Sequence, residues 1–141
     1  MKKPKNPYLM ILLMILLTIL GLLFVVAASI AEAIMDKTQF HYDKSIFSQD
    51  KYKQTFWNPN LSWVNKWKDN SAKEEKFLGS SSIFVFTTDA WHLFKFFRNT
   101  FLFIGLPLLS FGSMNIILAA ILARIIYGLV FTICFDKLLI K

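Results

Sequence analysis

Residues 8–31 form an unbroken apolar run without a charged side chain, and this run limits the chain to a few kinds of fold. Its 24 residues exceed the ~20 that an α-helix needs to cross the hydrocarbon core of a bilayer. The whole chain has 141 residues, of which 55% are hydrophobic. This composition is too apolar for a soluble domain of the same size. We therefore predict a transmembrane helix over about 8–35.

Lysines precede this run, and Ala31-Glu32-Ala33 follows it. A basic start and a small-x-small sequence are also typical of a cleaved secretory signal, but the apolar part of such a signal usually covers about 7–15 residues. We therefore expect a retained membrane anchor. The basic start favours a cytoplasmic N-terminus, whereas the lysines of the following loop favour the opposite orientation. The richness in Lys, Asn, Ile and Phe indicates a bacterial protein, so we expect a bacterial cytoplasmic membrane with the N-terminus in the cytoplasm.

Residues 36–81 are polar and form the expected extramembrane loop. Eight lysines and six acidic residues alternate there with aromatic side chains, including Trp57, Trp63 and Trp67. Tryptophan and lysine together are typical of segments at a membrane surface, because the indole ring and the long lysine stem both bridge apolar and polar zones. A loop of this length usually carries structure of its own. We predict short helices near the lipid headgroups.

The apolar C-terminal third, residues 82–135, is too long for one crossing, since as a helix it would extend roughly 80 Å. The sequence from Pro107 to Ser113 contains proline, glycine and serine and predicts a break. We expect transmembrane helices over about 83–108 and 114–135. The predicted fold is an all-α integral membrane protein that forms a single membrane domain over residues 1–141. An alternative has two crossings, with residues 83–98 lying in the interface.

Ionisable side chains occur inside these apolar segments, where they are costly and usually functional. The rise per residue of a helix places Asp89 and His92, near the start of the predicted helix 83–108, at about the same depth as Glu32 and Asp36, near the end of the predicted helix 8–35. Ion pairing would lower the cost of burying them. We expect Glu32 or Asp36 to pair with Lys95 or Arg124, and Asp89 to pair with His92 or Arg98.

The same region contains metal-ligand types. Asp89, His92, Glu32 and His41 would form a divalent metal site if the fold brought them together. Asp89, His92 and Glu32 are then the candidate catalytic residues of a metal-dependent hydrolase, or another enzyme, that acts on a lipid-like substrate. The chain has no HExxH motif and no run of histidines, so apart from this possible divalent metal no cofactor is predicted.

Other function classes find little support. The net charge is +7, but basic and acidic residues are mixed and no arginine-rich arm exists, so nucleic-acid binding is not expected. Small residues at Ala119, Ala120 and Ala123 would allow another helix to approach closely. We expect an accessory or structural subunit of a membrane protein assembly, whose partners are lipids and either other subunits or further copies of the chain. A membrane-embedded enzyme and a component that moves protons or ions are the alternatives.

Overall fold

The computed structural model describes residues 6–49, 53–113 and 115–141. In these residues, three helices are long and apolar enough to cross a membrane. They are α1 (Pro7–Phe40), α4 (Ala90–Gly112) and α5 (Ile116–Ile133), of which the last continues as a π-helical turn, η5 (Cys134–Leu138). The prediction of an all-α membrane protein with three spanning helices is thus confirmed.

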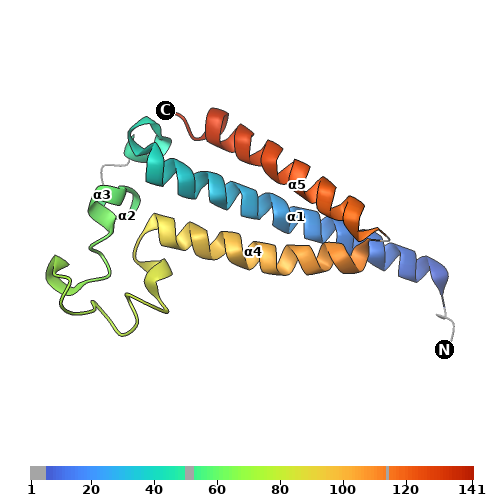
Figure 1. Ribbon diagram of the computed structural model, residues 1–141, viewed down its shortest axis with the longest axis horizontal. Coiled ribbons are helices and arrows are strands. Elements are labelled where there is room, and N and C mark those ends of the chain that lie inside the picture. Colours follow the sequence, from blue (N-terminus) through green and yellow to red (C-terminus); the bar gives the residue numbers. More distant parts are fainter. Residues whose placement is uncertain (1–5, 50–52, 114) are drawn as a thin grey trace.

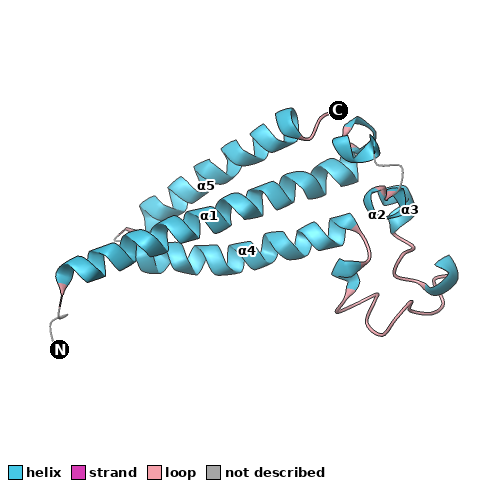
Figure 2. Ribbon diagram, turned by 180° about the vertical axis from the view of Figure 1, so that it is seen from behind, coloured by secondary structure: helices cyan, strands magenta, loops and turns pink. Residues whose placement is uncertain are grey.

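The three helices form an open bundle around α1. The α4 helix runs antiparallel to α1, and α5 turns back from its far end, so that α4 and α5 diverge from their connection toward the loop (Figure 1). The chain ends beside the start of this loop, where the Ile46 amide donates to the Leu139 carbonyl at 3.2 Å and the Lys141 amide donates to Lys44 at 3.1 Å. The loop and the C-terminus therefore lie at the same end of the bundle (Figure 2).

The α1 helix is longer than its apolar run. It starts where the Asn6 side chain accepts the Tyr8 amide at 3.0 Å, and it reaches Phe40 rather than ending near residue 35. The extension contacts the end of α5, because the Lys37 ammonium donates to the Phe135 carbonyl at 2.8 Å. Lysine is a good helix former, so this polar turn continues the helix beyond the apolar segment.

The α4 helix begins at Ala90, later than the expected start near residue 83. Asp89 has an extended backbone, and its side chain accepts the His92 amide at 2.9 Å as an N-cap. Such a cap satisfies a backbone donor that is free at every helix start. The helix then continues through Pro107 to Gly112 instead of breaking at the proline. The proline lacks a backbone N–H and therefore removes one hydrogen bond from the helix.

Glycines bring the backbones of α1 and α4 into contact. A Cβ atom added to Gly21 would lie 2.7 Å from the Leu109 Cγ and 2.9 Å from the Gly105 oxygen, and one added to Gly112 would lie 2.7 Å from the Thr18 amide nitrogen. Small residues of this kind permit close packing of membrane helices, where the hydrophobic effect contributes little. The two helices consequently form the tightest interface of the bundle.

The α5 helix is attached to α1 by a polar contact. The buried Ser29 hydroxyl donates to the Tyr127 carbonyl at 2.6 Å. Below this contact Val25, Leu109 and Ala123 form a small core shared by the three helices. The helix bounds agree with the expected span of 114–135 to within two residues.

The loop contains the short helices that its length predicted. They are α2 (Gln54–Trp57), α3 (Pro59–Ser62), and the 3-10 helices η1 (Tyr42–Lys44), η2 (Ile46–Gln49) and η3 (Lys68–Asn70). A further 3-10 helix, η4 (Val85–Thr87), lies in the segment expected to begin the second spanning helix. The Trp57 ring stacks on Phe47 at a centroid distance of 4.3 Å and faces Phe94 of α4 at 6.0 Å. These ring contacts join the first part of the loop to α4.

One carboxylate organises the tight turn after α3 and η3. Glu75 accepts the Gly79 amide at 2.8 Å, the Ser81 amide at 3.1 Å and the Ser81 hydroxyl. Gly79 has a φ of +79°, a conformation that residues with a Cβ rarely adopt. The hydroxyl and the two amides favour the charged carboxylate, so the pKa of Glu75 lies below its ordinary value of 4.5.

We expect this turn to loosen in acid. Because the folded pKa of Glu75 is lowered, its contribution is present above pH 4.5 and is lost as the pH falls through the folded pKa. Hydrogen exchange of the peptide over residues 75–82, corrected for intrinsic rates, should accelerate in that range. Glu75→Gln should remove the pH dependence. Corrected exchange that is the same at pH 3 and pH 6 in the wild type would contradict the role of the carboxylate.

Candidate functional site

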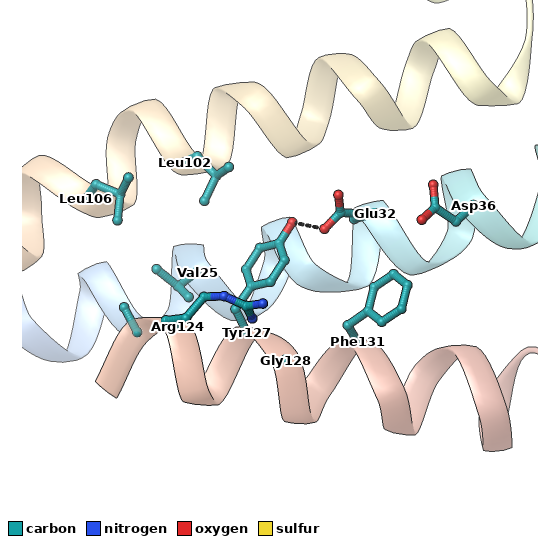
Figure 3. A pocket seen from close by; sticks show the side chains of 10 residues that line it. Val25, Glu32, Asp36, Leu102, Leu106, Arg124, Tyr127, Gly128 and Phe131 are labelled. Carbon is teal, nitrogen blue, oxygen red and sulfur yellow. Dashed lines mark hydrogen bonds between the residues drawn. The ribbon is translucent and has the colours of Figure 1, made fainter. Parts of the chain in front are cut away.

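The diverging α4 and α5 helices leave a cleft whose floor is α1. Its volume is about 450 Å³. All three helices contribute to its lining, as Figure 3 shows. The lining residues are Val25, Glu32, Asp36, Leu102, Leu106, Ala123, Arg124, Tyr127, Gly128 and Phe131.

The cleft is polar toward the loop and apolar toward the turn between α4 and α5. Its charged lining residues are Glu32, Asp36 and Arg124. A second cavity of about 380 Å³ shares Leu106 and Ala123 with it and extends toward the turn along apolar side chains. Together the two cavities form a groove between α4 and α5, which we call the α4–α5 groove.

Glu32 links all three helices at the polar end. One oxygen of its carboxylate lies 3.3 Å from the Arg98 Nη1 of α4, and the other accepts the Tyr127 hydroxyl of α5. The side chains of Arg98 and Glu32 are only 23% and 27% exposed. Hydrogen bonds to a charged group at low exposure are stronger than those between neutral groups, so this carboxylate fixes the relative positions of α4 and α5.

Two further charges, Asp36 and Arg124, line the groove without a hydrogen bond or an ion pair of their own in the described residues. Asp36 does interact electrostatically with Arg98, whose ion pair is with Glu32. The Arg124 side chain lies across Gly128, where an added Cβ would be 3.1 Å from its Nη1. In Figure 3 it extends beside Tyr127 toward the end of the groove that holds the acidic side chains. Gly128 therefore leaves room for Arg124 to reach the polar end.

The ion pairs differ in part from those that helix depth suggested. Glu32 pairs with Arg98 rather than with Lys95 or Arg124. Lys95 instead lies over the Trp91 ring at 4.5 Å and does not line the groove. The reason is rotational: residues three apart on a helix point in directions about 60° apart, and Arg98 is the one that faces Glu32 of α1.

Asp89 and His92 form the expected pair, and Asp89 also caps the start of α4. The His92 Nδ1 lies 2.7 Å from the Asp89 Oδ2, and the Thr88 hydroxyl donates to the same oxygen at 3.2 Å. Asp89 is 3% exposed. Its side chain bonds to Thr88 and His92, which identifies Asp89 as a helix cap at the loop end of the bundle rather than as a charge within the span.

The structure separates the four candidate metal ligands. Glu32 lies in the groove, Asp89 and His92 cap α4, and His41 contacts the Phe135 ring edge-on at 5.4 Å. Across residues 6–49, 53–113 and 115–141, no group of three or more His, Cys, Asp or Glu side chains lies close enough to hold a metal ion. The arrangement that the groove does support is ion pairing and hydrogen bonding next to an apolar channel.

Sequence reasoning missed three polar residues that connect α1 to α5, namely Ser29, Lys37 and Tyr127. A weak signal for Tyr127 existed, because it follows Arg124 by three positions on a helix and so lies near the same face. Lys37 is 4% exposed and lies 4.3 Å above the Phe135 ring. Its burial could not be inferred from a loop that contains many exposed lysines.

Comparison of the chain with known protein families, with curated proteins and with solved structures finds no match. Its function must therefore be inferred from the groove and from the side chains that line it.

Proposed function

We propose that the chain is a small accessory subunit of a membrane protein assembly and that its α4–α5 groove receives a transmembrane helix of a partner protein. The observation that carries this proposal is that the charges of Asp36 and Arg124 line the groove and that neither forms an ion pair with any residue the structure describes. Charged side chains in a spanning helix normally pair or line a water-filled cavity. A partner helix would supply the missing groups.

The shape of the groove supports a helix as the occupant. On the α5 side the groove is lined by Ala119, Ala120 and Ala123, and small residues allow a second helix to approach closely. On the α4 side it is lined by leucines, including Leu102 and Leu106. We expect the partner helix to be apolar, with a basic residue opposite Asp36 and an acidic, amide or hydroxyl residue opposite Arg124.

The basic N-terminus and the composition support a bacterial cytoplasmic membrane with the N-terminus in the cytoplasm. In this orientation the loop and the C-terminus would lie outside the cytoplasm. The partner helix would then meet the charged end of the groove near the outer surface.

Photocrosslinking in the native membrane tests the proposal. A photoreactive phenylalanine analogue at Leu106, which lines the groove, should give a discrete adduct with a membrane-spanning protein. The matched control is Phe103, which lies on the same helix, is 82% exposed and does not line the groove. The adduct should weaken roughly tenfold in the double variant Asp36→Asn, Arg124→Gln, since a loss of about 1.4 kcal/mol corresponds to that factor.

Two outcomes would overturn the partner assignment. Adducts of equal intensity from positions 103 and 106 would mean that the groove has no special occupant. A position-106 adduct that contains only lipid would mean that the bilayer itself fills the groove. A discrete adduct of two copies of this chain would instead make the partner a second copy.

A further inference from the structure

We propose that residues 77–86 form a wedge that inserts into the lipid headgroup region beside α4, on the loop side of the membrane. The occupant of this apolar surface is the bilayer itself. The inference concerns a different surface from the α4–α5 groove and does not depend on the proposed partner helix. Figures 1 and 2 both place this part of the loop on the side of α4 away from α5.

The wedge exposes large apolar side chains although it lies outside the three spanning helices. Leu78 is 92% exposed, Ile83 is 76% exposed and Phe84 is 46% exposed. An isolated exposed apolar residue is ordinary, whereas a contiguous group usually marks an interaction surface. Ile83 and Phe84 lie together, since both border the space above Gly79, the residue that follows Leu78.

The position of the wedge along α4 indicates a membrane as the contact. Ile83, Val85 and Phe86 share a cavity lining with α4 residues as far along that helix as Asn99. The Phe86 ring stacks on Phe96 at 4.4 Å. Asn99 lies about 14 Å along the helix axis from Ala90, so the chain before α4 folds back along the helix, toward the apolar part of the bundle.

The position of Asn99 relative to the hydrocarbon core follows from the preceding residue, Arg98. Arg98 pairs with Glu32, and Glu32 is the first charged residue after the apolar run 8–31. The level of Arg98 and Asn99 is therefore the level at which the hydrocarbon core begins on the loop side. The end of the wedge approaches this boundary through Phe86, which stacks on Phe96. Amphipathic segments at such a boundary bury their apolar face about 5–10 Å into the lipid.

Internal hydrogen bonds hold the wedge in this shape. The buried Ser80 hydroxyl donates to the Lys66 carbonyl at 2.7 Å, and Glu75 accepts the Gly79 and Ser81 amides. Its turn is thus fixed, which keeps Leu78 projecting outward. Lys68 of the same loop pairs with Glu74, whereas Lys66, Lys73 and Lys76 add positive charge that suits anionic headgroups.

Spin labelling in lipid vesicles tests the wedge. The single native cysteine is first removed by Cys134→Ala, and cysteines for the label are introduced by Leu78→Cys and, as a matched aqueous control, Lys73→Cys. In vesicles of phosphatidylethanolamine and phosphatidylglycerol, collision with oxygen and with a water-soluble nickel complex reports the depth of each label. We expect the label at position 78 to lie about 5–10 Å below the phosphate level and the label at position 73 to lie in water.

A label at position 78 that is as accessible to nickel as the label at position 73 overturns the proposal. Circular dichroism checks that each labelled protein retains its helices. If Leu78→Cys does not fold, Ile83→Cys takes its place with the same two outcomes. Insertion of the wedge and the absence of a partner adduct from Leu106 are independent results, so each proposal can fail alone.

Discussion

Replacement of Gly21 by isoleucine should separate α1 from α4 and produce the largest loss of stability of any single change in the bundle. Even the first added carbon would lie 2.7 Å from the Leu109 Cγ, 2.8 Å from its amide nitrogen and 2.9 Å from the Gly105 oxygen. Two of these are backbone atoms, which cannot yield without moving the whole helix. Overpacking a core costs about 1–3 kcal/mol when side chains can adjust, so we expect at least about 3 kcal/mol here.

The free energy of unfolding in mixed micelles of mild detergent and dodecyl sulfate measures this effect. Gly21→Ala should give a smaller loss in the same direction, because it adds only the first carbon. Leu23→Ile is the matched control, since Leu23 is 59% exposed on the surface of the same helix and should leave stability nearly unchanged. Equal stability of Gly21→Ile and the wild type would show that α1 and α4 do not pack through their glycines.

The second large effect is expected at Glu32. Glu32→Ala removes the acceptor of both the Arg98 guanidinium and the Tyr127 hydroxyl. The guanidinium then remains at low exposure without its ion pair, although Asp36 is still a nearby opposite charge. Losing a hydrogen bond to a charged group costs about 1.5–3 kcal/mol. We expect a loss of about 2–3 kcal/mol in the same unfolding measurement, together with greater mobility of α5 relative to α4.

A double-mutant cycle separates the hydroxyl from the guanidinium. Tyr127→Phe should cost about 1 kcal/mol in the wild type and close to nothing in the Glu32→Ala background. The control pair is Lys68 and Glu74, whose atoms lie 3.2 Å apart but whose side chains are 60% and 69% exposed. Glu74→Ala should change stability by less than about 1 kcal/mol. If Tyr127→Phe costs the same in both backgrounds, Glu32 does not connect the two helices.

Prediction from the sequence worked best for features that depend on long runs of residues. The apolar stretches identified three spanning helices, and the mixture of lysine and tryptophan identified the loop. Prediction was less accurate at helix ends. The start of α4 depends on whether Asp89 caps a helix or lies inside one, and the apolar residues at 83–86 are compatible with both.

The choice of ion-pair partners also depended on tertiary packing. Helix rise placed Glu32 at about the right depth, but rotation decided that Arg98 and not Lys95 would meet it. Rotation is set by the glycine contacts between α1 and α4, which lie two or more helical turns away from these charges on the same helices. The separation of His41 from Asp89 and His92 likewise follows from where each helix ends.

The sequence by itself determined which segments are long and apolar enough to cross a membrane and which segments hold the charges, because hydrophobicity acts on each segment separately, and it left two or three crossings open. Only the tertiary structure decided that α4 and α5 diverge, that Asp36 and Arg124 line the resulting groove and that residues 83–86 fold back along α4. These features arise from contacts between distant segments, through close glycine packing and a shared carboxylate, and such contacts leave no periodic pattern in the chain.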